Sequence, residues 1–421
     1  MQQAQSHGQA VSVPAIRYWR LRPAVLGAIA LSALVAGCTT GTGPRPSAGP
    51  GKPVGVEGAV AERDKQRVAV LVPTTGPNAA LGQSIANAAN MALLDSGNQR
   101  IRLTVYNTAG GAAGAAQRAL DEGNRLFLGP LLAPDVRAVQ GIAHSANVPI
   151  LSFSNDASLA GGGTYVLGFQ VDQSIERVVQ FARGRGVARF AALVPTGAYG
   201  ERASGAMLRA VEDSGGRLTS IAPYSRDTRG LTAAVRKLTG MNAPTARAQV
   251  RPDGTVVRND PRPAAASFDA VLIADSGKVA LAAFPLLQKS GAGNARLLGT
   301  ELWNTEPGLA KVAAMRGAWF ASVSDTTFRQ FASRYRARFG GAPYRLASLG
   351  YDSVLLVNRV AARWEPATPF PQAALRDGGG FAGVDGAFRF AGAGVAVRAL
   401  EVQQIDAGGF SVVSPAPARF E

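Results

Sequence analysis

Short runs of apolar residues alternate along much of the chain with segments in which apolar residues recur every three or four positions. The runs are typical of buried parallel strands, and the recurring pattern is typical of amphipathic helices that cover a sheet. The first pair is the run at residues 68–72, followed by an apolar stripe from Ile85 to Leu93. Further strands are expected at residues 101–106, 125–128, 149–153, 190–194, 270–274 and 297–298. Alternating strands and helices predict right-handed βαβ units and mostly parallel sheets.

The strand-and-helix pattern starts twice. The segments LVPTTGPNAALG from Leu71 and LVPTGAYGERASG from Leu193 each combine the end of a strand, a Pro-Thr pair, a loop with glycine and the start of a helix. Further helices are expected at residues 113–122, 136–144, 175–182, 203–211, 328–335 and 345–362. The near-repetition predicts two similar α/β lobes that begin with the same unit.

Residues 239–267 interrupt this pattern with four prolines and a Pro-Asp-Gly turn between valines. We expect an insertion that forms a small hairpin on a long loop. Its charged residues are Arg247, Arg251, Arg258 and Arg262, opposed by Asp253 and Asp260. They predict an exposed arm that contacts a partner or an anionic polymer, although a merely tolerated loop fits equally well. Near the C-terminus, Asp-Gly and Gly-Gly turns between alternating strands predict antiparallel pairs.

The N-terminal segment is typical of an export signal. Arg17, Arg20 and Arg22 precede an apolar stretch of about 15 residues, which is short for a membrane span and ends in small residues at Cys38. The string LVAGC resembles a bacterial lipobox, which implies cleavage before Cys38 and lipidation of its thiol. A plain signal or membrane anchor with an incidental cysteine is the alternative. The Gly-, Pro- and Ser-rich residues 38–65 then form a flexible tether.

The composition indicates a basic protein without a nucleic-acid signature. The formal net charge is +16, and it is +13 (41 basic and 28 acidic residues) without the three arginines before Cys38. Such a charge fits attraction to an anionic surface or arginines spread over a solvated surface. Because no block of consecutive basic residues and no basic helix with interleaved aromatics occurs, we expect no nucleic-acid partner.

Catalytic patterns are scarce. The two histidines are His7, in the predicted signal, and His144, at the end of a predicted helix. The sequence has neither His-Glu-x-x-His nor Gly-x-Ser-x-Gly, and no phosphate-binding loop. The first loop lacks the spaced glycines of a dinucleotide-binding turn. We therefore expect a non-enzyme with no cofactor and no metal site.

Small polar residues follow the predicted strands, at residues 74–78, 129–135, 152–156, 196–199 and 299–303. In open α/β sheets, ligands gather beyond the carboxyl ends of the strands and at helix N-termini. Two facing lobes with such loops predict a cleft for a small polar solute that closes by a hinge motion.

Five strings resemble, in order, the class I periplasmic binding proteins of the leucine-binding type: LVPTTGPNAALGQSIANAANMAL, GPLLAPDVRAVQGIAHSANVPILSFSND, AYGERASGAMLRAVEDSGG, LGYDSVLLV and FAGVDGAFRF. The resemblance implies two doubly wound parallel-sheet lobes joined by three crossings, near residues 169–173, 323–326 and 381–385. The implied organisation is a signal at 1–37, a tether at 38–65, lobe I at 66–170 and 324–381, and lobe II at 171–323 and 382–421. The lipobox, GPLLAPDVRA, VPILSFSND and the insertion look most like the penicillin-binding protein activators, lipoproteins of the cell envelope.

The resemblance also implies a ligand site. Glu301, in LGTELW, matches the acidic residue that holds a ligand ammonium, and Tyr199 matches the aromatic residue that covers the ligand. Ala133 stands where a serine contacts the ligand carboxylate, and Asp156 stands where a threonine is usual. The residue that contacts the ligand ammonium is therefore kept, whereas the contact with the ligand carboxylate is lost. The carboxylate of Asp156 would also repel the carboxylate of the ligand. The remaining expected cleft residues are Thr75, Gly76, Asn78, Ser154 and Asn155.

Each of these positions has a structural alternative. Asp156 fits a helix cap, Glu301 a surface ion pair and Tyr199 a core position. Two functions therefore remain open. One is a regulator of peptidoglycan synthesis with a penicillin-binding protein as partner, and the other is the receptor of an ABC permease for an amino acid, amide or similar solute. Either implies the periplasmic side of the envelope, with a lipid anchor in the outer or inner membrane.

Overall fold

The computed structural model describes residues 64–241, 249–250, 256–257, 267–417 and 420, with two large sheets. The first sheet has the strand order β13-β14-β15-β5-β4-β3-β1-β2. Its N-terminal strands are β1 (Gln66–Val72), β2 (Ile101–Asn107), β3 (Phe127–Leu128), β4 (Ile150–Ser152) and β5 (Thr164–Val166). Its later strands are β13 (Phe381–Gly383), β14 (Gly386–Ala391) and β15 (Val395–Arg398). The five N-terminal strands pair in parallel, whereas β13, β14 and β15 pair antiparallel with one another.

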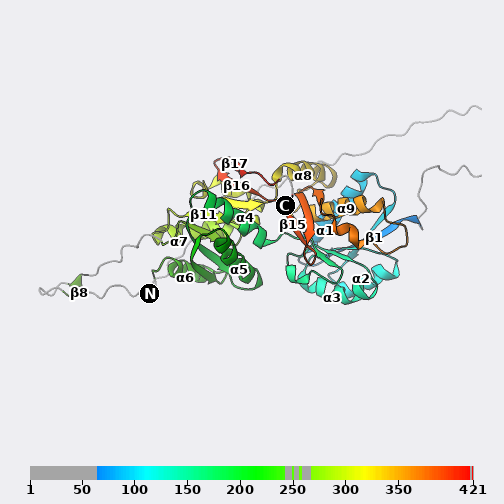
Figure 1. Cartoon of the computed structure of the whole chain (residues 1–421), viewed down its shortest axis with the longest axis horizontal. Helices are drawn as coiled ribbons and strands as arrows, with labels where there is room; N and C mark the ends of the chain where they lie inside the picture. The colour runs from blue at the N-terminus through cyan, green and yellow to red at the C-terminus, as the bar shows by residue number, and fades with distance from the viewer. Residues whose placement is uncertain (1–63, 242–248, 251–255, 258–266, 418–419, 421) are drawn as a thin grey trace, which may run out of the picture. The chain divides into compact units, whose positions relative to one another are not determined.

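Helices cover both faces of the first sheet. One core cluster joins the sheet to α1 (Ala79–Ser96), α8 (Asp325–Phe339) and α9 (Ala347–Ala361). The other cluster joins the opposite face to α2 (Ala112–Asp121) and α3 (Ala133–Ser145). Figure 1 shows α1 and α9 side by side, and residues of both are buried in the first cluster. This three-layer unit is lobe I.

The second sheet has the order β17-β16-β12-β11-β10-β6-β7. Its strands are β6 (Arg189–Pro195), β7 (Arg217–Tyr224), β10 (Ala270–Ile273), β11 (Arg296–Gly299), β12 (Trp319–Ser322), β16 (Glu401–Asp406) and β17 (Gly409–Ser414). Helices α4 (Val171–Gly184) and α5 (Ala198–Asp213) cover one face, and α6 (Thr228–Leu238) and α7 (Gly277–Lys289) cover the other. This unit is lobe II, and the prediction of two α/β lobes with mostly parallel sheets is confirmed.

The two similar segments that begin at Leu71 and Leu193 each bring a helix into close contact with the end of the preceding strand. A Cβ atom on Gly82, in the first turn of α1, would lie 1.9 Å from the carbonyl oxygen of Pro73, which follows β1. A Cβ atom on Gly200, in the first turn of α5, would lie 1.6 Å from the carbonyl oxygen of Pro195, which ends β6. Only glycine lets each helix approach its strand end this closely.

The chain passes between the lobes at residues 167–170, 323–324 and 399–400, between strands or helices of different sheets. The third crossing corrects our prediction of residues 381–385 and the assignment of 382–421 to lobe II. Strands β13, β14 and β15 belong to the first sheet, because β15 pairs with β5 at Val395 and Val166. Only β16 and β17 belong to lobe II.

Buried charges lie beside these crossings. Arg345 Nη1 forms an ion pair with Asp385 Oδ1, and both side chains are almost fully buried. The buried Arg398 donates from Nη2 to the Leu167 carbonyl at 2.9 Å, which links the third crossing to the first. Burial, followed by the nearby charge of Asp385, raises the pKa of Asp352, whose carboxylate accepts the backbone N–H of Val384 at 2.6 Å.

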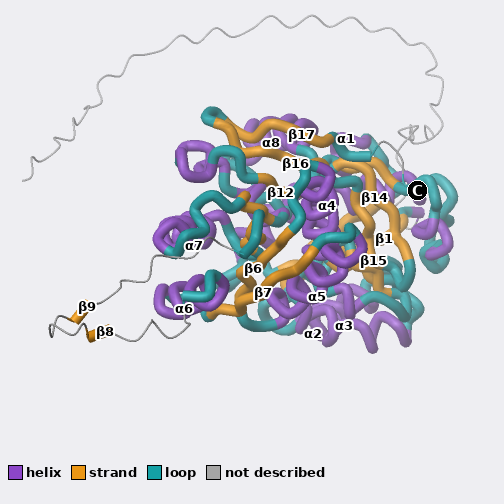
Figure 2. Tube along the Cα trace, turned by 60° about the vertical axis from the view of Figure 1, so that its left-hand side comes forward, coloured by secondary structure: helices purple, strands orange, loops and turns teal. Residues whose placement is uncertain are grey.

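The insertion contains the predicted hairpin. Strands β8 (Gln249–Val250) and β9 (Val256–Val257) pair antiparallel, and within the described residues they form a two-stranded sheet of their own (Figure 2). The four arginines of the predicted arm lie outside the described residues, as do Cys38 and the predicted signal and tether up to residue 63.

Candidate functional site

The 3-10 helix η3 (Glu301–Thr305) carries the main polar groups of the candidate site. It follows β11 directly, where a Cβ atom on Gly299 would lie 2.2 Å from the ring of Trp303. Trp303 is fully buried, and its Nε1 donates to the Asp275 carbonyl at 3.0 Å. Gly299 and Trp303 therefore fix η3 against the end of the second sheet.

Glu301 has one partnered and one unpartnered carboxylate oxygen. The Tyr199 hydroxyl donates to Glu301 Oε1 at 3.3 Å and lies 3.3 Å from the Thr300 hydroxyl. Glu301 Oε2 is buried and has no hydrogen-bond partner among the described residues. Burial raises the pKa of Glu301 to about 7, although its own backbone N–H and the hydroxyl groups of Tyr199 and Ser174 oppose the shift. An unpartnered buried carboxylate oxygen is the place for an N–H donor from a ligand.

A cavity of about 350 Å³ lies in front of η3. Its apolar walls are Leu81, Leu131, Leu132, Phe153, Phe169, Leu302, Val323 and Leu346. Its polar groups are Asn155, Glu301, Asn304, Thr305 and Arg345. Segments of both lobes thus enclose a cavity that is mostly apolar and carries a few polar groups. Such a cavity is typical of small-molecule sites.

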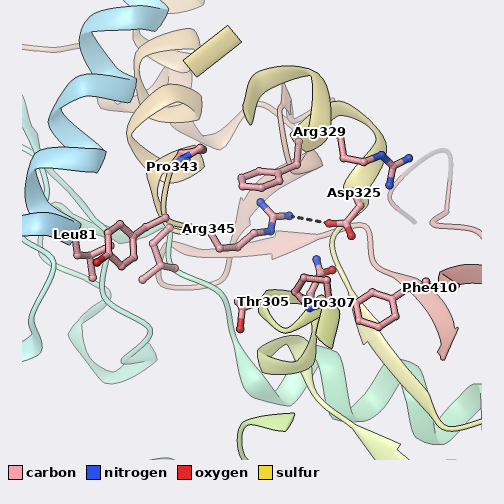
Figure 3. Close-up of a pocket in the computed structure, with 13 residues that line it drawn as sticks. Leu81, Thr305, Pro307, Asp325, Arg329, Pro343, Arg345 and Phe410 are labelled. Carbon is pink, nitrogen blue, oxygen red and sulfur yellow. Dashed lines mark ion pairs between the residues drawn. The ribbon is translucent and has the colours of Figure 1, made fainter. Parts of the chain in front are cut away.

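A larger hollow of about 750 Å³ shares Leu81, Asn304, Thr305, Arg345 and Leu346 with this cavity. Figure 3 shows Arg345 in the middle of this hollow, pointing toward Asp325. The Nη2–Oδ1 distance of this ion pair is 4.0 Å. Because Arg345 also pairs with Asp385, its charge is already matched by two carboxylates.

The comparisons with known proteins agree with this architecture. A family model described as "Periplasmic binding protein" matches residues 65–409. The chain belongs to the periplasmic binding protein family. Its predicted resemblance to the class I, leucine-binding type is confirmed.

Solved structures of other periplasmic binding proteins share the fold. A leucine-binding protein from Thermotoga maritima is 18% identical, with a TM-score of 0.60 over 84% of this chain and 99% of that one. A putative branched-chain amino acid ABC transporter protein from Rhodospirillum rubrum is 18% identical, with a TM-score of 0.67 over 83% and 100%. A solute-binding protein from Rhodopseudomonas palustris BisB5, in complex with 3,4-dihydroxybenzoic acid, is 16% identical, with a TM-score of 0.62 over 85% and 98%.

A curated relative matches a shorter stretch. An uncharacterized protein of Rickettsia prowazekii (strain Madrid E) is 24% identical over 179 residues, which are 42% of this chain and 48% of that protein. The match therefore spans about half the length of that relative, and it does not identify a ligand.

Two of the nine expected cleft residues, Asn155 and Glu301, line the 350 Å³ cavity of this binding protein. Tyr199 reaches it through its hydrogen bond to Glu301. Thr75 and Gly76 form an exposed turn before α1, where Asn107 Nδ2 donates to the Thr75 hydroxyl at 2.9 Å. Asn78 is the N-cap residue of α1. The Ser154 hydroxyl is buried and accepts the backbone N–H of Asp156 at 3.2 Å.

Asp156 has the structural role that we considered as its alternative. Its Oδ1 accepts the backbone N–H and the hydroxyl of Ser158, at 3.2 and 2.7 Å, and caps a short 3-10 helix. Arg137 and Arg202 also pair with its carboxylate. Burial acts to raise its pKa, but the Ser158 hydrogen bonds and both arginines outweigh it and lower the pKa. The expected repulsion of a ligand carboxylate is therefore offset by two positive charges.

Ala133 begins α3 and packs beside Val136 and Leu159, outside the cavity walls. Among the lining residues not named as site residues, Leu131, Leu132 and Leu302 lie in the predicted ligand loops, whereas Asn304 and Arg345 lie outside them. Asn304 could have been found, because a residue three positions after Glu301 lies on the same side of a 3-10 turn. Within the described residues, no group of acidic, histidine or cysteine side chains could hold a metal, and no helix is long and apolar enough to cross a membrane.

Proposed function

We propose that this protein is a non-enzymatic solute receptor on the periplasmic side of the cell envelope, and that its solute carries an amine. The buried, unpartnered Oε2 of Glu301 at the 350 Å³ cavity is the observation that carries the proposal. An ammonium group on the solute supplies the missing donor and a matching charge. An ABC permease is the partner that this function implies, and Cys38 is the proposed lipid anchor.

The choice of an amine follows the role that the resemblance implies for Glu301 and is supported by the unpartnered oxygen of this residue, not by the ligands of the neighbours. One neighbour of the same fold was solved with 3,4-dihydroxybenzoic acid, and another, from Desulfitobacterium hafniense, with Leu. The fold thus holds chemically different ligands in different proteins. Glu301 favours the amine because a carboxylate in a partly desolvated cavity attracts cations and disfavours anions.

Native mass spectrometry of the purified full chain, followed by calorimetry with simple amines, tests the proposal. We expect saturable binding of an apolar primary amine that is lost in Glu301→Gln, whereas Glu212→Gln, an exposed site on α5, leaves binding unchanged. Equal binding by wild type and Glu301→Gln contradicts the assignment of Glu301.

A second function, regulation of peptidoglycan synthesis through a penicillin-binding protein, is supported by different observations. These are the resemblance of GPLLAPDVRA and VPILSFSND to the activator lipoproteins and the alanine at position 133 in place of the usual serine. A pull-down of the host's bifunctional penicillin-binding proteins with the full chain tests it. No interaction, together with normal wall synthesis in a deletion strain, argues against this function.

A further inference from the structure

Two buried acceptors on η3 lack donors. Glu301 Oε2 and Asn304 Oδ1 have no hydrogen-bond partner among the described residues. Asn304 is only 8% exposed, so its oxygen has little access to bulk water. Buried polar atoms are nearly always hydrogen-bonded in native proteins. Arg345, which lines the same cavity, adds two donors without a hydrogen-bond partner in the described part of the chain, Nε and Nη2, so these atoms together indicate a ligand with two donors and an acceptor.

The two residues that carry these acceptors line the same cavity. A 3-10 helix has about three residues per turn, so Glu301 and Asn304 lie on one side of η3. Both line the 350 Å³ cavity. Asn304 Nδ2 donates to the Val323 carbonyl at 3.4 Å, which fixes the orientation of the amide and leaves Oδ1 as the free acceptor. The reversed amide would set two oxygens against each other.

We propose that the solute presents a primary ammonium next to an amide N–H, as in an α-amino amide or the N-terminus of a short peptide. The ammonium binds Glu301 Oε2, and the amide N–H donates to Asn304 Oδ1. Asn155, whose side chain also lines the cavity, can donate to the amide carbonyl. The apolar walls accept an aliphatic side chain. This inference rests on the proposed function, since it names the solute class of the same site.

A free amino acid fits this donor and acceptor pattern less well. Its carboxylate has only acceptors and cannot satisfy Asn304 Oδ1. The loop that would meet a carboxylate carries Leu131, Leu132 and Ala133, none of which has a side-chain donor. Arg345 lines the cavity and pairs with Asp385 and Asp325, and its Nε and Nη2 have no hydrogen-bond partner among the described residues, so they can bind the carbonyl oxygen of an amide or the carboxylate of a short peptide. The larger hollow, which shares Asn304 and Arg345, has room for the rest of a peptide.

Calorimetry of the full chain with four leucine derivatives tests the inference. Leucinamide and leucylglycine contain both donors, leucine lacks the amide, and leucine N,N-dimethylamide lacks only the amide N–H. We expect the first two to bind at least about tenfold more tightly than the last two, since a bond to a buried acceptor contributes about 1.4 kcal/mol or more. Asn304→Leu should remove this preference by weakening leucinamide binding to the level of the dimethylamide.

The outcomes separate the inference from the function that it extends. If leucine and the dimethylamide bind as tightly as leucinamide, the inference is wrong and the amine receptor stands. If the preference for leucinamide survives in a folded Asn304→Leu variant, the acceptor is misassigned and the inference is wrong. If no amine in the series binds to wild type, the proposed receptor function is wrong and the inference falls with it.

Discussion

Arg137 Nη2 lies 2.8 Å from Asp156 Oδ2, and Arg202 Nη1 lies 3.8 Å from the other oxygen of the same carboxylate. Arg137 belongs to α3 of lobe I, whereas Arg202 belongs to α5 of lobe II. Asp156 therefore joins charges from both lobes in addition to capping its own turn. The carboxylate that we expected to repel a ligand is committed to these structural contacts.

Two substitutions at Asp156 should separate the stability that comes from its helix cap from the stability that comes from its ion pairs. Asparagine keeps a cap acceptor and removes the ion pairs, so Asp156→Asn should cost less than about 1 kcal/mol of unfolding free energy. Asp156→Ala removes both and should cost about 1–2 kcal/mol. Because the folded pKa is lowered, this stability is present above the unfolded pKa and is lost as the pH falls through the folded pKa. Urea unfolding at pH 7 and pH 3 measures both effects, and an equal cost at both pH values argues against the ion pairs.

The pair formed by Arg345 and Asp385 should be strongly coupled. Asp385 is fully buried and Arg345 is 9% exposed, so Asp385→Ala leaves the buried guanidinium with only its 4.0 Å contact to Asp325. We expect a loss of about 3–5 kcal/mol. Arg345→Met combined with Asp385→Ala should cost less than the two single changes together, because neither member of this closest pair is left without the other. A double-mutant cycle from urea unfolding gives the coupling, and simple additivity contradicts it.

Gly82 and Gly200 should resist substitution even by alanine. An added methyl group at either position meets a proline carbonyl oxygen at less than 2 Å, so the helix must move away from its strand end. We expect each change to alanine to cost more than about 2 kcal/mol, in the range of overpacked sites. Gly141, an exposed glycine within α3 with no atom near its Cβ position, is the matched control. Gly141→Ala should be neutral or stabilising by up to about 1 kcal/mol, because alanine favours the helix.

The sequence predicted elements where a local pattern decides the structure. Strand β1 was predicted because residues 68–72 are five consecutive apolar residues. In the structure all five are fully buried. Strand β7 was missed because it is an edge strand with mostly half-exposed residues and no continuous apolar run. The third crossing was misplaced because β15 finds its partner, β5, more than 200 residues earlier in the chain, and no local pattern encodes that pairing.

The candidate site shows the same limit. Glu301 and Tyr199 followed from the resemblance, and the structure joins them by a hydrogen bond. Leu131 and Leu132 lie in the loop 129–135 that was expected at the ligand, but the expectation rested on small polar residues, and it is these two apolar side chains that line the cavity. Arg345 was predicted only as the start of a helix, because its partner Asp385 lies 40 residues away. Contacts over such distances depend on tertiary packing that a single sequence does not display.

Removal of the insertion should leave the fold intact. Strands β8 and β9 form a two-stranded sheet of their own in the described part of the chain, so neither large sheet loses a strand when residues 242–266 are replaced by a short Gly-Ser linker. We expect the Tm to change by less than about 2 °C, as for a tolerated surface loop. If the predicted basic arm binds a partner, the same deletion should weaken that binding. A large fall in Tm would instead show that the insertion packs against a lobe.

The ionisation of Glu301 should couple stability and binding to pH in opposite directions. Its folded pKa of about 7 lies above the unfolded value, so folding favours the protonated form. Stability that depends on this group is therefore present below the unfolded pKa and is lost as the pH rises toward 7. Glu301→Gln should accordingly raise the unfolding free energy by up to about 3 kcal/mol at pH 8 and change it little at pH 4.5.

Amine binding needs the ionised form, and protons compete with the ligand below the folded pKa. Affinity for an amine that stays protonated throughout should therefore rise about tenfold between pH 6 and pH 8, as expected for a single group that titrates near 7. Tyr199→Phe removes a hydrogen bond that holds the pKa of Glu301 down, so it should move the midpoint of this profile to higher pH. Calorimetry with an aliphatic primary amine, whose own pKa is about 10, measures both profiles across this range without a change in the charge of the ligand. A flat profile in wild type would mean that Glu301 is already ionised at pH 6 and that its burial does not control binding.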